Sequence, residues 1–235
     1  MFKVNFNEII EAIPQKPYFR DGEVALYLAD SLALLPQISA QVSAIITDPP
    51  WPGTKYISFD DAYRLFEKTA RAFNDLSDRL IVILGCDSDP RFLNAVPSEY
   101  RFLSCCWLRR IPPVYKGNIL YSADIAYVFG QPRAHEHTSN ILPTETYSVS
   151  RGKRDGINSH PFFRPEKTMR WLVSHFTQEG DIVLDPFAGS GSTLVAAKYL
   201  GRKAIGIEIE PDYCQIAVER LRQMVMPLET KPVEV

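Results

Sequence analysis

The sequence lacks several features that would place it quickly in a class. None of its four cysteines stands in a Cys-x-x-Cys pair, so we expect reduced thiols rather than a disulfide framework or a structural zinc site. No basic stretch followed by an apolar run lies near the N-terminus, and no apolar run is long enough to cross a bilayer. We therefore expect a cytoplasmic protein with no bound metal and no membrane association.

An excess of positive charge is also missing, because the net charge is -2 over 235 residues. A protein that binds nucleic acid need only be basic locally, however. Two cationic clusters meet this condition, one between residues 101 and 116 without any acid and one around 151–154; solvated surface charge is the alternative for each. The candidate phosphate contacts are Arg109, Arg110, Lys116, Arg151, Lys153 and Arg154.

What the sequence does contain is an alternation of short β-rich runs with helical patterns. Such alternation is typical of an α/β fold with a mostly parallel sheet and helices on both faces. Apolar residues at helical spacing predict helices over residues 60–74, 165–176, 192–200 and 211–224. Seven strands are expected, over residues 24–29, 44–47, 80–84, 102–108, 125–129, 182–184 and 204–209.

Residues 131–159 interrupt this alternation. They are rich in Pro, Gly, Ser, Thr, Asn and charged residues and show little periodicity. Loops of this length inside a compact domain are uncommon and are usually functional or mobile. We expect a single domain over residues 1–235 in which 131–159 is an inserted loop that helps to recognise the substrate; a plain surface loop is the alternative. A metal site at His135 and His137 is a weaker alternative to solvated side chains.

A Gly-rich run, Asp-Pro-Phe-Ala-Gly-Ser-Gly-Ser-Thr, spans residues 185–193 between an apolar strand and a helix. Gly189 and Gly191 allow a sharp turn and a close approach of the backbone to a ligand. The run lacks the Gly-Lys-Ser/Thr of phosphate loops and the full Gly-x-Gly-x-x-Gly of dinucleotide-binding proteins, so adenosine without phosphates fits better. Glu208, about twenty residues later at the next strand's end, is expected to accept hydrogen bonds from both ribose hydroxyls, with Glu210 as the alternative.

A second motif, Asp48-Pro49-Pro50-Trp51, follows the apolar run at 44–47. Consecutive prolines supply no N–H and hold the backbone extended, so the strand ends there. The Asp48 carboxylate and the Pro49 carbonyl are then two acceptors beside an aromatic ring. This combination suits an exocyclic NH2 group of a nucleic-acid base; a polar turn with a packed Trp is the alternative.

Together the two motifs resemble the amino-methyltransferases that modify N6 of adenine or N4 of cytosine in DNA. The tetrad precedes the Gly-rich run, an order similar to that of the circularly permuted β class, and the resemblance covers most of the chain. It implies a seven-stranded Rossmann-like fold, S-adenosylmethionine as the cofactor, and Asp48, Pro49, Pro50 and Trp51 as the catalytic tetrad. The permutation implies that residues 24–29 pair with 204–209 and that the two termini lie close together.

The resemblance also implies a set of cofactor-binding residues. Asp30 resembles a strand-end acid near the cofactor's adenine. His160 and Arg164 resemble a segment near its methionine carboxylate, with Arg164 replacing the common Lys. The full set is Asp30, Asp48, His160, Arg164, Asp185, Pro186, Phe187, Ala188, Gly189, Ser190, Gly191, Ser192, Glu208 and Ile209.

The reaction implied by the resemblance is methyl transfer to N6 of an adenine that is flipped out of duplex DNA. Asp48 and the Pro49 carbonyl would accept both amine hydrogens, and Trp51 would stack on the base. The leading Asp favours adenine; an N4-cytosine enzyme, an RNA adenine enzyme, a protein glutamine methyltransferase and a non-catalytic cofactor-binding subunit are the alternatives. The small size of the chain implies a short recognition site or help from a homodimer partner.

Overall fold

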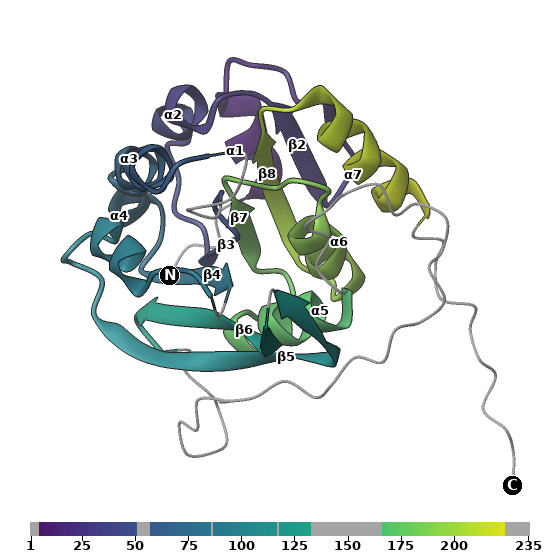
Figure 1. Cartoon of the computed structure of the whole chain (residues 1–235). Coiled ribbons are helices and arrows are strands. Elements are labelled where there is room, and N and C mark those ends of the chain that lie inside the picture. The colour runs from purple at the N-terminus through teal and green to yellow at the C-terminus, as the bar shows by residue number, and fades with distance from the viewer. Residues whose placement is uncertain (1–4, 51–56, 86, 117, 133–165, 224–235) are drawn as a thin grey trace, which may run out of the picture.

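An eight-stranded sheet forms the centre of the part of the chain that is described by the structure, a computed structural model covering residues 5–50, 57–85, 87–116, 118–132 and 166–223. The strand order is β1-β2-β8-β7-β3-β4-β6-β5 (Figure 1). Strands β2, β8, β7, β3 and β4 are parallel neighbours, whereas β1 and the β5–β6 hairpin join through antiparallel pairing. The strands are β1 (Phe19–Arg20), β2 (Val24–Leu28), β3 (Ala44–Thr47), β4 (Arg79–Gly85), β5 (Phe102–Lys116), β6 (Ile119–Gly130), β7 (Ile182–Asp185) and β8 (Lys203–Glu208).

Helices cover both faces of this sheet, which confirms the predicted α/β fold (Figure 1). One face carries α1 (Phe6–Ala12), α2 (Ser31–Leu34), η1 (Leu35–Gln37), α3 (Phe59–Ala70), α4 (Phe73–Leu76) and η2 (Pro90–Ala95). The other carries α5 (Glu166–Phe176), α6 (Ser192–Tyr199) and α7 (Pro211–Gln223). Aromatic rings fill the first layer, where Phe66 stacks on Phe92 with ring centroids 5.1 Å apart. No helix in the described residues is long and apolar enough to cross a membrane.

All seven predicted strands are present, with ends that shift by a few residues and a longer β5–β6 hairpin than expected. The sheet has one strand more than predicted. This strand, β1, is only two residues long and pairs with β2 through Phe19 and Leu26. Two residues carry no periodicity, so sequence pattern could not reveal it.

The single helix predicted over 60–74 is wrong in one respect, since the chain forms two helices there. α3 starts at the cap Ser58, whose Oγ accepts the amide of Asp61 at 3.1 Å. It ends at Ala70, and the amide of Ala72 then bonds three residues back, to the Thr69 carbonyl at 3.2 Å. This tight turn leaves Phe73 in the same buried layer as α3, so the apolar pattern continues across the break.

The predicted pairing of residues 24–29 with 204–209 is confirmed. β2 and β8 are parallel, with Val24 opposite Ala204 and Leu28 opposite Glu208. β2, from the N-terminal part of the chain, therefore lies in the sheet beside β8, which comes from the C-terminal part. The prediction that the two termini lie close together concerns residues 1–4 and 224–235, which lie outside the described residues.

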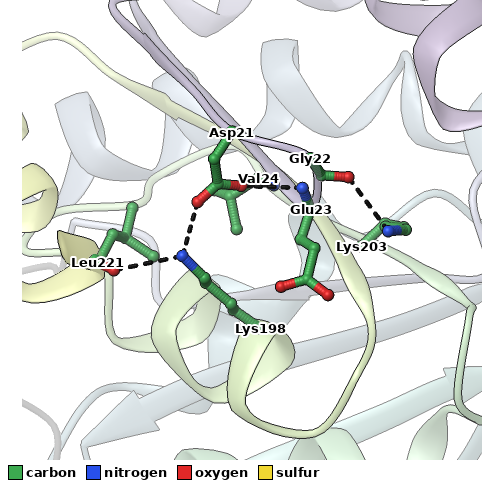
Figure 2. Close-up of polar contacts among 7 residues, drawn as sticks. All are labelled: Asp21, Gly22, Glu23, Val24, Lys198, Lys203 and Leu221. Carbon is green, nitrogen blue, oxygen red and sulfur yellow. Dashed lines mark hydrogen bonds and ion pairs between the residues drawn. The ribbon is translucent and has the colours of Figure 1, made fainter. Parts of the chain in front are cut away.

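Lys198 in α6 links the turn before β2 to α7 (Figure 2). Its Nζ donates to Oδ2 of Asp21 at 2.6 Å and to the Leu221 carbonyl of α7 at 3.3 Å. The other oxygen of Asp21 accepts the amides of Glu23 and Val24, each at 2.8 Å (Figure 2). Burial alone would raise the pKa of Asp21, but these hydrogen bonds and the charge of Lys198 hold it below its ordinary value.

Candidate active site

Four carboxylates gather at one edge of the sheet. Asp30 follows β2, Asp48 follows β3, Asp185 ends β7 and Glu208 ends β8. Because β2, β8, β7 and β3 are parallel neighbours, their carboxyl ends meet at the same edge, where ligands bind in such folds. All four side chains line a cavity of about 660 Å³, a size suited to a small-molecule ligand.

The Gly-rich run forms the turn between β7 and α6. Gly189 and Gly191 have φ angles of +52° and +76°, a conformation that side-chain-bearing residues rarely adopt. A Cβ atom on Gly191 would lie 2.8 Å from the Cβ of Ala217, so the turn also needs glycine to pack against α7. The amide of Ala188 bonds the Ile207 carbonyl at 2.9 Å, which fixes the turn against β8.

Glu208 is held in place by this turn. Its Oε2 accepts the amide of Gly189 at 2.7 Å, and its Oε1 accepts the amide of Glu210 at 2.8 Å. Burial raises the pKa of Glu208, and these backbone bonds oppose the rise. A carboxylate oxygen can accept more than one hydrogen bond, so both oxygens can still serve a ligand. Glu210, the alternative, is exposed at the rim of the cavity.

Asp185 is the most deeply buried acid of the cavity, with 2% of its surface exposed. Burial raises its pKa to about 7, and the negative charges of Asp48 and Glu208 add to the effect. The hydroxyl of Thr193 and the amide of Phe187, which donates at 3.1 Å, act in the opposite direction. Asp185 therefore accepts hydrogen bonds from residues near both ends of the Gly-rich run, Phe187 and Thr193.

Asp48, Pro49 and Pro50 line the same cavity, directly after the fully buried end of β3. Asp48 is half-buried, and its charge acts on Asp185 across the cavity. The Asp48-Pro49-Pro50 motif and the Gly-rich run are far apart in the chain, and the fold brings them together at one site. Trp51, the last residue of the predicted tetrad, lies outside the described residues.

Asp30 has a structural task as well as a place in the cavity. Its carboxylate caps α2 by accepting the amide of Leu32 at 2.9 Å. The next residue, Ser31, donates from its hydroxyl to the carbonyl of Pro186. Ser31 was missed by sequence reasoning, yet it ties the end of β2 to the start of the Gly-rich turn.

Arg220 of α7 is a second residue that sequence reasoning missed. Its Nη1 donates to the Ser190 carbonyl at 2.5 Å and to the Ser192 hydroxyl at 3.1 Å. No local pattern marks it, because its partners lie about thirty residues earlier in the chain. An apolar wall was also missed, made of Ile57, Leu65, Met169 and Tyr213.

Only some of the remaining predicted site residues line the cavity. Phe187, Ala188, Ser190, Ser192 and Ile209 line the cavity, with Ile209 61% exposed. Arg109 is exposed on β5 and does not line the cavity, and the backbones of Arg110 and Lys116 lie in the same strand. The others fall outside the described residues, namely Arg151, Lys153, Arg154, His135, His137, His160 and Arg164. Among the described residues, no three His, Cys, Asp or Glu side chains form a metal-binding group.

Part of the chain matches a known family. The profile of the DNA methylase family matches residues 111–219, which include the Gly-rich turn and Glu208. The chain is 43% identical over 76 residues to the type II methyltransferase M2.DpnII of Streptococcus pneumoniae, and 35% identical over 99 residues to the DNA adenine methyltransferase YhdJ of Escherichia coli K12. These segments span 32% and 41% of this chain but only 28% and 33% of the two relatives.

Solved structures match over a larger part of the chain. The M1.HpyAVI–SAM complex has a TM-score of 0.65 and 25% identity, and covers 84% of this chain and 98% of its own. The cytosine-N4-specific PvuII DNA methyltransferase has a TM-score of 0.70 and 20% identity, with 88% and 89% covered. The chain therefore has the fold of the S-adenosylmethionine-dependent DNA methyltransferases, and residues 111–219 match the DNA methylase family.

Proposed function

We propose that the protein transfers a methyl group from S-adenosylmethionine to N6 of adenine in DNA, and that it belongs to the permuted β class. The observation that carries the proposal is the union of Asp48-Pro49-Pro50 with the Gly-rich turn and Glu208 in one cavity. The family match and the fold support DNA methylation in general. The adenine assignment depends on the leading Asp48 and is supported by the similarity to YhdJ.

The charge of the cavity fits this cofactor. Six acidic residues line it in the described part of the chain, and no Lys or Arg does; they are Asp30, Asp48, Asp185, Glu208, Glu210 and Asp212. Such a lining repels polyphosphates and attracts a cation, and the cofactor carries a positive sulfonium and an ammonium group. Glu208 would hold the ribose hydroxyls, and the apolar side chains of Phe187 and Ile209 would flank the adenine.

The bound cofactor supplies a methyl group that is already activated, so the protein must mainly position the acceptor. A base amine is a poor nucleophile because its lone pair is delocalised into the ring. Asp48 and the Pro49 carbonyl accept the two amine hydrogens and so turn the lone pair toward the methyl group. Pro49 and Pro50 have no N–H and so cannot extend the hydrogen-bonded ladder of β3 past Asp48. Asp48 then takes the proton that leaves the methylated amine.

The base reaches this cavity only if it leaves the helix, so we propose that the target is flipped out. In this scheme Trp51 stacks on the flipped base, and residues 131–159 help to read the sequence around it. His160 and Arg164 hold the methionine carboxylate of the cofactor. Arg109 and the other cations of the two clusters contact phosphates of the DNA backbone.

Nucleoside mass spectrometry tests the proposal. The purified protein is incubated with methyl-labelled S-adenosylmethionine and unmethylated genomic DNA or RNA, and the nucleic acid is digested to nucleosides. We expect labelled N6-methyladenine from DNA, and the same from a control variant, Asp75→Ala, in which an exposed acid outside the cavity is removed. Labelled N4-methylcytosine would overturn the base assignment, label only in RNA would overturn the DNA assignment, and no label would overturn the activity.

A further inference from the structure

The β5–β6 hairpin projects beyond the carboxyl end of its neighbour β4. The last pair between β4 and β6 joins Gly85 and Asp124, yet β5 and β6 continue to pair as far as Lys116 and Ile119. Five residues of β6 therefore extend past β4, which is about 16 Å of strand at roughly 3.3 Å per residue. β4 is parallel to β3, so the hairpin extends at the edge of the sheet where Asp48 lies.

The end of the hairpin exposes large apolar side chains. Tyr115, Ile119 and Leu120, which we call the arm tip, are 71%, 58% and 48% exposed. Tyr115 and Leu120 are register partners, so they project from the same face of the hairpin. Apolar groups gathered on a projecting element commonly mark a binding surface.

The charge of the hairpin indicates what this surface binds. Residues 107–123 contain three cations, Arg109, Arg110 and Lys116, and no acid. In the described part of the chain, the cavity at the same edge of the sheet is lined by six acids and by no Lys or Arg. The cavity itself therefore offers no favourable contact to a phosphate backbone. A polyanionic substrate whose target base enters the cavity must then be held by basic elements around it, and the hairpin is one of them.

We propose that the arm tip inserts into the DNA next to the target base, where its apolar side chains stack against bases and favour the departure of the target from the helix. This proposal rests on the proposed function, since it concerns the same substrate. Apolar side chains of other DNA-binding proteins unstack neighbouring bases in this way. Arg109, exposed at the base of the projecting segment, contacts a phosphate of the same duplex.

The double variant Tyr115→Ala/Leu120→Ala tests the proposal, with Tyr18→Ala as the matched control. Tyr18 is an exposed tyrosine just before β1, at the opposite end of the sheet. Cofactor affinity, affinity for mixed-sequence duplex DNA, and methylation rates on duplex and heat-denatured DNA are measured for each protein. We expect the double variant to bind cofactor normally and to lose about tenfold in duplex binding and methylation, as lost stacking implies. The loss should be smaller on denatured DNA, where no base pair must open.

Three results would overturn the proposal. One is a double variant that binds and methylates duplex DNA as well as Tyr18→Ala does. Another is an equal loss on duplex and denatured DNA, which would make the arm tip a general contact rather than a wedge. The third is light scattering that shows a dimeric wild-type protein and a monomeric double variant, while the DNA affinity per protomer stays the same. The arm tip would then be an interface between copies. An inactive wild-type protein would count against the proposed function; affinities for duplex and denatured DNA, which need no turnover, would then give the same comparison between the variants.

Discussion

The amide of Gly189 donates a 2.7 Å hydrogen bond to Oε2 of Glu208, and this bond joins the two segments that form the candidate cofactor site. Gly189 belongs to the turn after β7, and Glu208 ends β8, nineteen residues later. The bond fixes the carboxylate before any ligand arrives. The turn and the acid therefore act as one preorganised unit, and damage to either should weaken the same ligand.

Glu208→Gln should weaken S-adenosylmethionine binding. The ionised carboxylate makes stronger hydrogen bonds than a neutral amide, so we expect a loss of about 10-fold to 100-fold. Isothermal titration calorimetry measures this directly. The matched control is Glu210→Gln, two residues away and exposed, for which we expect less than about a threefold change. A larger effect at Glu210 than at Glu208 would transfer the ribose-binding role to Glu210.

Arg220→Met should loosen the Gly-rich turn, because it leaves the Ser190 carbonyl and the Ser192 hydroxyl without their shared donor. We expect a loss of about 1–3 kcal/mol in the free energy of unfolding, together with weaker cofactor binding. Urea denaturation measures the first effect. Arg222→Met, an exposed arginine on the same helix, is the control and should change both quantities little. Equal effects of the two variants would show that Arg220 has no specific role in holding the Gly-rich turn.

Asp185 should make stability depend on pH. Its pKa is raised to about 7 in the folded protein from an ordinary value of 3.8, so between these values the folded chain binds more protons than the unfolded chain. The contribution of Asp185 to stability therefore falls as pH rises through this window, by about a few kcal/mol, and stays low above pH 7. Asp185→Asn should remove the fall. The difference in unfolding free energy between variant and wild type should then grow from pH 4 to pH 8; a constant difference would contradict the raised pKa.

The Asp21–Lys198 pair should make the free energy of unfolding depend on pH in the opposite direction (Figure 2). The pKa of Asp21 is lowered by folding, so its contribution is present above the unfolded pKa and is lost as pH falls through the folded value. Lys198→Met should therefore cost about 1–2 kcal/mol at pH 7 and clearly less at pH 3. Lys203→Met, which removes a bond to the Gly22 carbonyl, is the control and should show no such dependence. A cost for Lys198→Met that is the same at both pH values would show that lost packing, not the ion pair, is responsible.

The sequence predicted the sheet and the acids that meet at the cavity better than it predicted the residues that support this cavity. Apolar runs marked seven strands, and two local motifs identified Asp48 and Asp185, because each motif is contiguous in the chain. The spacing from the Gly-rich run to the end of the next strand identified Glu208. Ser31 and Arg220 act on carbonyls 155 and 30 residues away, and no local pattern encodes such a distance. The projection of the β5–β6 hairpin beyond β4 depends on strand register, which becomes visible only once the sheet is assembled.

The central claim is that Asp48, although it is also expected to contact the cofactor, acts chiefly on the methyl acceptor. The most direct test compares Asp48→Ala with the wild-type protein in two measurements, the dissociation constant for S-adenosylmethionine and the single-turnover rate of methyl transfer to DNA. We predict a dissociation constant within about threefold of the wild-type value and a rate that falls by about 100-fold to 10,000-fold, as expected for loss of a positioned proton acceptor. A variant that binds the cofactor and still methylates DNA at a near-normal rate would contradict the claim.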